Sequence, residues 1–96
     1  MTYEIPLSAE PSQTLAIQLG GVSCRVTVYQ KRTGLYVDVS VNDRLVLSGI
    51  LGRDRTWLVR GKHFGFPGDL TFIDTQGTAD PVYTGLGDRF KLVWQA

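Results

Sequence analysis

The fold is decided by the stretch TLAIQLGGVSCRVTVYQKRTGLYVDVSVN, which runs from Thr14 to Asn42. Apolar residues take every second position in three segments of it, the period of strands that keep one face in a core. Gly20-Gly21 separates the first two segments, and adjacent glycines suit the positive φ angles of a two-residue hairpin turn. A second turn is expected over residues 31–34. The stretch therefore predicts three antiparallel strands.

The rest of the chain reads as further short strands and turns. Strands are expected at residues 44–50, 56–60, 70–74 and 90–95, and turns at 42–43, 52–54 and 67–69. Residues 75–87 are expected to form an irregular loop, and residues 1–11 an extended N-terminal arm with a short edge strand near residues 3–5 at most. The prediction is a single all-β domain over residues 1–96. Its six to seven strands form a small antiparallel meander closed into a barrel or sandwich.

Composition narrows the functional classes. The 96 residues are 43% hydrophobic and 20% charged, which indicates a globular chain. The formal net charge of +1 gives no strong overall electrostatic attraction to nucleic acid or membranes. No signal-peptide pattern follows Met1, and no apolar run approaches the ~18 residues of a membrane span. We therefore expect a protein made and kept in a cytoplasm, with no membrane partner.

Residues with catalytic or metal-binding chemistry are sparse. His63 is the single histidine and is expected to be a loop residue. Cys24, the single cysteine, lies on the inward phase of its strand, which indicates a core residue rather than a nucleophile. The aspartates within two residues of Gly, Pro or Asn are expected to stabilise turns; they are Asp43, Asp54, Asp69, Asp80 and Asp88. No enzyme activity, metal or cofactor is predicted.

One segment, residues 53–66, mixes basic and aromatic side chains. Its members are Arg53, Arg55, Trp57, Arg60, Lys62, His63, Phe64 and Phe66. Three interpretations stay open: core aromatics with solvated arginines, a protein–protein interface, or a site for single-stranded nucleic acid. Tyr83 and Leu86, in the 75–87 loop, are further candidates for a protein interface. The rival function is a small oligonucleotide-binding β-barrel, although that fold usually carries a helix and no helical period is present.

A chain-long series of short motifs resembles a known family. In order they are Ile5-Pro6-Leu7, Pro11-Ser12-Gln13-Thr14, Arg25, Gly34-Leu35-Tyr36-Val37-Asp38-Val39, Leu47-Ser48-Gly49-Ile50, Pro67-Gly68-Asp69-Leu70, Asp74, Gly77, Asp80-Pro81 and Leu86-Gly87-Asp88-Arg89-Phe90-Lys91-Leu92. The series resembles the small baseplate plug proteins of contractile-tailed phages, of the cyanophage type. Residues 53–66 match none of the family's motifs.

The resemblance implies a structural component of a virion, or of a prophage or tail-like particle. Such a protein sits centrally in the tail baseplate, packs with the hub and tail-tube proteins, and assembles in the host cytoplasm. A homo-oligomer of threefold or sixfold symmetry is implied by baseplate symmetry, and nucleic acid is not expected as a partner. The family offers no catalytic residues to transfer to this chain.

Overall fold

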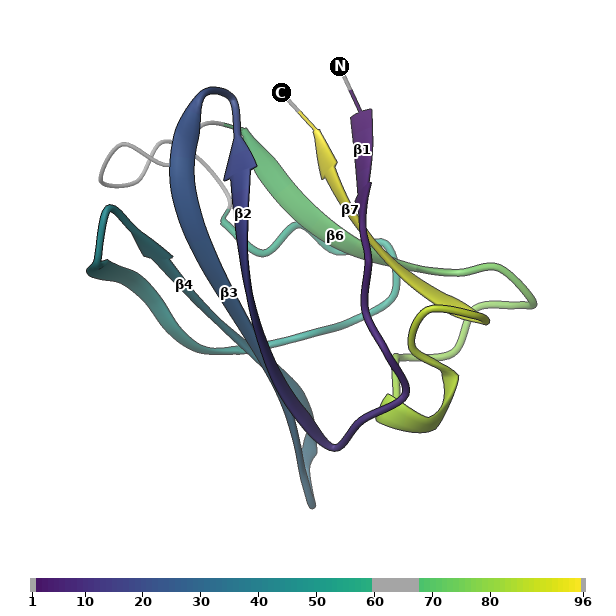
Figure 1. The fold of residues 1–96 in the computed structure, drawn as a ribbon. Helices are drawn as coiled ribbons and strands as arrows, with labels where there is room; N and C mark the ends of the chain where they lie inside the picture. Colours follow the sequence, from purple (N-terminus) through teal and green to yellow (C-terminus); the bar gives the residue numbers. More distant parts are fainter. Residues whose placement is uncertain (1, 60–67, 96) are drawn as a thin grey trace.

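The computed structural model describes residues 2–59 and 68–95, which form two antiparallel sheets (Figure 1). The larger sheet is a meander in the order β2-β3-β4-β5. Its strands are β2 (Ser12–Leu19), β3 (Val22–Lys31), β4 (Gly34–Val41) and β5 (Arg44–Leu51). The three strands predicted from the opening stretch are confirmed, as is the strand expected at residues 44–50.

The smaller sheet, in the order β1-β7-β6, brings the two ends of the chain together. Its strands are β1 (Thr2–Ile5), β6 (Asp69–Asp74) and β7 (Phe90–Gln95). Thr2 pairs with Gln95, so the termini lie side by side at one end of the molecule (Figure 1). The short edge strand expected in the N-terminal arm is confirmed.

Two-residue turns fix the register of the meander. Gly20 and Gly21 have φ angles of 59° and 79°, and Asn42 and Asp43 have φ angles of 50° and 66°. Positive φ at both central residues is the signature of the turn whose twist matches that of paired strands. Asn and Asp tolerate this conformation better than most residues that carry a Cβ. Both turns were predicted from the sequence.

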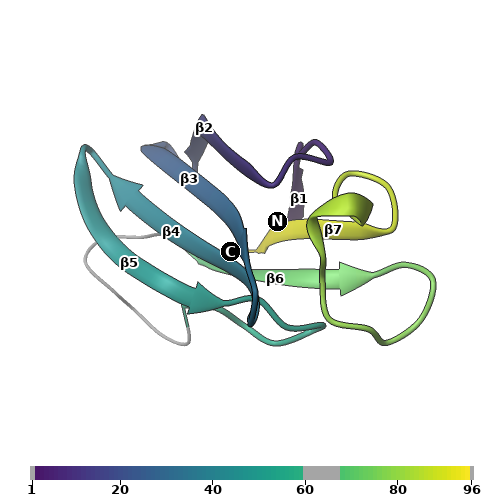
Figure 2. The same cartoon turned by 90° about the horizontal axis from the view of Figure 1, so that it is seen from below.

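The core lies between the two sheets, which curve around it (Figure 2). Cys24 is only 2% exposed and belongs to this core, as predicted, and burial raises the pKa of its thiol. Alternate residues of strands from both sheets fill the core, among them Val26, Val28, Val37, Val39, Leu70, Phe72, Leu92 and Trp94.

The fold is a sandwich, and the barrel alternative is wrong. A closed barrel needs a continuous hydrogen-bonded ladder around the sheet, whereas the seven described strands divide into two separate sheets. The N-terminal strand β1 pairs with β7 and not with β2, so it does not join the smaller sheet to the larger one.

Two further expectations need correction. The strand predicted at residues 56–60 does not form over its described part, 56–59, because Arg55 takes a φ of 54° and turns the chain out of the extended path. One isolated bridge, between Trp57 and Thr71, remains there. The loop at 75–87 is not wholly irregular, since it contains a short 3₁₀ helix, η1 (Tyr83–Gly85). Within residues 2–59 and 68–95, no helix has the length and apolar character needed to cross a membrane.

Candidate partner-binding surface

Residues 54–59, here called the covering segment, lie along the free edge of β6. The Arg55 N–H donates to the Phe72 carbonyl at 2.7 Å, and the Leu58 N–H donates to the Leu70 carbonyl at 2.8 Å. The Val59 N–H donates to Asp69 Oδ1 at 2.7 Å. These bonds satisfy backbone groups that an edge strand would otherwise leave open. They also fix where the side chains of the covering segment point.

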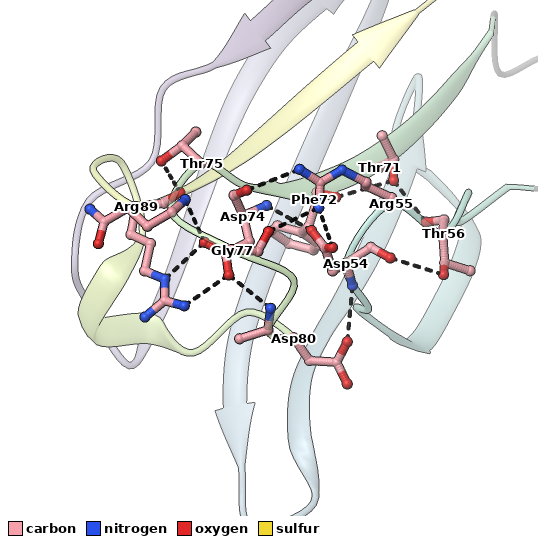
Figure 3. A network of polar contacts seen from close by, with 12 residues as sticks. Asp54, Arg55, Thr56, Thr71, Phe72, Asp74, Thr75, Gly77, Asp80 and Arg89 are labelled. Carbon is pink, nitrogen blue, oxygen red and sulfur yellow. Dashed lines mark hydrogen bonds and ion pairs between the residues drawn. The ribbon is translucent and has the colours of Figure 1, made fainter.

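An ion pair between the buried Asp74 side chain and the partly exposed Arg89 side chain anchors the end of β6 (Figure 3). Arg89 donates to Asp74 twice, from Nε to Oδ1 at 2.8 Å and from Nη2 to Oδ2 at 2.9 Å. The Asp74 side chain is fully buried and also accepts the N–H groups of Gln76 and Ala79. The hydrogen bonds from Arg89 hold the pKa of the Asp74 carboxyl well below its usual range. Asp74 is therefore a carboxylate in the folded protein.

The covering segment connects to this ion pair through Asp54 and Arg55 (Figure 3). Asp54 Oδ1 accepts the Asp74 N–H at 2.7 Å, and the Asp54 N–H donates to Asp80 Oδ1 at 3.0 Å. The Arg55 guanidinium binds the Asp54 carboxylate and the carbonyls of Gly77 and Asp74. Asp54 was predicted to stabilise only its own turn, and its bonds to residues far along the chain go beyond that role.

An open hollow of about 310 Å³ lies on the outer face of the smaller sheet. We call it the Trp57 hollow; it is lined by Thr2, Arg55, Trp57, Thr71, Ile73, Val93 and Gln95. Trp57 is 40% exposed at its rim, and the bonds of the covering segment hold its backbone against Thr71. Trp and Arg around a small apolar floor are the residue types that dominate binding energy at protein interfaces. The hollow suits a protruding apolar side chain of another protein.

The residues predicted to form an interface do not lie together on one surface of the structure. Arg55 and Trp57 meet at the Trp57 hollow, whereas Arg53 lines another depression beside β5. Tyr83 is half-buried, and its N–H donates to Gln30 Oε1 at 3.1 Å. Leu86 is 3% exposed and packs in the core, so its side chain offers nothing to a partner in this conformation. The remaining candidates lie outside the described residues; they are Arg60, Lys62, His63, Phe64 and Phe66.

Sequence reasoning missed the apolar members of the hollow's floor, Ile73 and Val93, as well as the polar lining residues Thr2, Thr71 and Gln95. Ile73 and Val93 lie on the outward phase of their strands, opposite the buried Phe72 and Leu92. An apolar residue in the solvent phase of an alternating strand is the signal that could have found them. The ion pair was also missed, because Asp74 and Arg89 are 15 residues apart and become neighbours only through the β6–β7 hairpin.

The described residues contain no group of three or more His, Cys, Asp or Glu side chains that could hold a metal ion. Among the same residues, every buried side-chain nitrogen and oxygen has a hydrogen-bond partner. The polar network therefore holds the fold together and shapes the outer face.

Comparison with known families gives the decisive observation. The model of a family described as the cyanophage baseplate Pam3 plug gp18 matches residues 2–96. The chain belongs to this family. Membership in the plug gp18 family indicates a baseplate plug protein of the virion tail and implies contact with other baseplate components. It indicates a structural role rather than catalysis. No curated protein matches the chain.

The motif at residues 86–92, which pointed to a plug protein, has a structural explanation. Leu86 and Phe90 are buried, and Arg89 binds Asp74. Gly87 has a φ of 80°, and a Cβ added there would lie 2.2 Å from the Leu7 carbonyl oxygen. The glycine therefore lets the N-terminal arm dock against the loop before β7. These residues build the fold.

Proposed function

We propose that this chain is a central plug of a contractile-tail baseplate that binds the hub and tail-tube proteins through the Trp57 hollow. The family supports a place in the baseplate, and the hollow supplies a surface of suitable chemistry. Assembly takes place in the host cytoplasm. Copies repeat around the tail axis in a threefold or sixfold arrangement, as the symmetry of a baseplate requires.

The observation that carries this proposal is the combination of exposure and rigidity at Trp57. The Trp57 side chain is 40% exposed, so a partner that covers it gains the burial energy of a large aromatic ring. The backbone that presents it is held at Arg55 and Leu58 by bonds to β6. Because the surface is ordered in advance, less conformational entropy is lost on binding.

The test is co-expression with the hub and tail-tube proteins of the same particle, followed by affinity purification through a tag on this chain. We expect at least one of these proteins to co-purify with the wild type. Trp57→Ala should weaken the association at least tenfold, since a hot-spot aromatic contributes about 2 kcal/mol or more.

The matched control is Leu45→Ala, which truncates a 58% exposed apolar side chain on the other sheet. This variant should bind as the wild type does, and circular dichroism should show that both variants are folded. Absence of both tail proteins from the wild-type eluate would contradict the proposal. Equal binding by the wild type and Trp57→Ala would show that the Trp57 hollow is not the binding surface.

A further inference from the structure

Four strand edges end the two sheets, and three of them are protected. β1 has four residues and carries Glu4, which pairs with Lys91. The edge of β6 is occupied by the covering segment. β5 breaks its register twice, and Gly49 adopts a φ of 64° within it. Short length, charge, bulges and a covering segment are the devices by which proteins stop an edge from pairing with another chain.

Within residues 2–59 and 68–95, nothing protects the edge of β2 in any of these ways. Its eight residues, Ser12–Leu19, pair with β3 without any shift of register. The strand contains no charged residue and no proline. Figure 2 shows β2 as the end of the larger sheet, and none of the other described strands continues it there. It is a long, regular and neutral edge of the kind that accepts another strand.

A single hydrogen bond fixes which backbone groups of β2 face outward. The Gln30 N–H donates to the Pro11 carbonyl at 2.8 Å, so residue 11 faces β3. Orientation alternates along an antiparallel strand, and the outward groups therefore belong to Ser12, Thr14, Ala16 and Gln18. All four residues are exposed, and within the described part of the chain no hydrogen bond uses their backbone groups.

We propose that two copies of the free protein pair through β2 in an antiparallel, two-fold arrangement. β2 carries no charged side chain, so two copies of it pair without electrostatic repulsion between facing residues. The pairing belongs to the protein in solution, before it joins an assembly, and it does not depend on the function proposed above.

The outward groups specify the register. Ser12 lies opposite Gln18 of the second copy, and Thr14 lies opposite Ala16, so that every outward N–H and carbonyl finds a partner. Leu15 then falls on the two-fold axis and faces its own copy. Leu15 and Ile17 are both half-buried at the open end of the core, and the added strand covers them further.

The oligomeric state is the first test. Light scattering after gel filtration should give twice the 10.6 kDa of one chain. Ala16→Pro removes an N–H that the monomer does not use, and proline is tolerated at such edge positions. The variant should be folded and monomeric. Leu45→Pro, on the β5 edge of the same sheet, should remain a dimer. A wild-type monomer, or a dimeric Ala16→Pro variant, would overturn the proposal.

If Ala16→Pro fails to fold, the double variant Thr14→Lys with Ala16→Lys replaces it. Both side chains are exposed, so the monomer retains its backbone bonds while like charges meet across the pair. Loss of the dimer is expected, and an unchanged dimer would again overturn the proposal.

Cross-linking tests the register. In a Cys24→Ser background, Leu15→Cys should form a disulfide-linked dimer on mild oxidation. Facing residues on the axis have Cα atoms about 4.5 Å apart, which lies within disulfide range. Gln18→Cys in the same background should stay unlinked, because residue 18 and its copy lie at opposite ends of the paired strands. Linkage through residue 18 and not 15 would refute this register.

Discussion

The guanidinium of Arg89 binds the carboxylate of Asp74 through two hydrogen bonds of 2.8 and 2.9 Å. The pair joins the end of β6 to the start of β7 and, through Asp54, to the covering segment that presents Trp57. A buried carboxylate is stable only when it is paired and hydrogen-bonded. The surface proposed to bind partners therefore depends on this ion pair.

Because of the ion pair, the stability of the folded protein should decrease at acidic pH. The pKa of Asp74 is depressed in the folded protein, so its stabilising effect is present above the unfolded pKa of about 3.9 and is lost as the pH falls towards the folded pKa. Melting temperature should fall steeply below about pH 4 in the wild type. Asp74→Asn should melt lower at pH 7 and show a shallower fall, as followed by circular dichroism.

The control for this experiment is Asp43→Asn. The Asp43 side chain is 89% exposed and its pair with Arg25 is 3.7 Å long, so this variant should keep the wild-type pH profile. Parallel profiles for wild type and Asp74→Asn would show that the ion pair does not control acid stability.

Gly87 should tolerate alanine less well than Gly21 does. Both glycines have φ near 80°, and alanine in this region costs roughly 1–2 kcal/mol. A Cβ at residue 21 meets nothing within 4 Å, whereas a Cβ at residue 87 meets the Leu7 carbonyl oxygen at 2.2 Å. Gly87→Ala should cost roughly 1–3 kcal/mol more in urea unfolding. Equal losses would show that the arm does not dock as described.

Asp38 should be needed for the bulge of β5. Its Oδ1 accepts the Gly49 N–H at 2.6 Å and the Tyr29 hydroxyl at 3.0 Å. Asp38→Ala leaves both donors without this acceptor and should cost roughly 1–3 kcal/mol in the free energy of unfolding. Asp38→Asn keeps an acceptor oxygen and should cost less. If both variants lose the same stability, the carboxylate has another role.

Single-stranded DNA should not bind in a salt-dependent manner. The guanidinium of Arg55 is engaged by Asp54 and two carbonyls, and the formal net charge is only +1. Fluorescence anisotropy with a labelled oligonucleotide at low salt should show no saturation at micromolar protein. Saturable binding that weakens steeply as salt rises would instead support an oligonucleotide-binding protein.

The meander was predictable because its information is local. The two-residue period and the paired turn residues specify β2 to β5 without reference to the rest of the chain. The division into two sheets was not predictable in this way. It depends on the pairing of β1 with β7 from the opposite end of the chain. The sequence of residues 2–5 does not indicate which strand they pair with.

The candidate surface was predictable only in part. Arg55 and Trp57 were found from their residue types, whereas Ile73 and Val93 join them only after β6, β7 and the covering segment are aligned. Arg53 was grouped with Arg55 by sequence proximity. The left-handed conformation of Arg55 turns the chain between them, and the two arginines line different depressions.

Electron cryomicroscopy of the intact particle tests the central claim most directly. We predict density for this chain in the tail baseplate, with Trp57 and the floor of its hollow at Ile73 and Val93 covered by a neighbouring baseplate protein. A particle that lacks the chain would contradict the proposed function. A baseplate in which the Trp57 hollow faces solvent would contradict the binding surface.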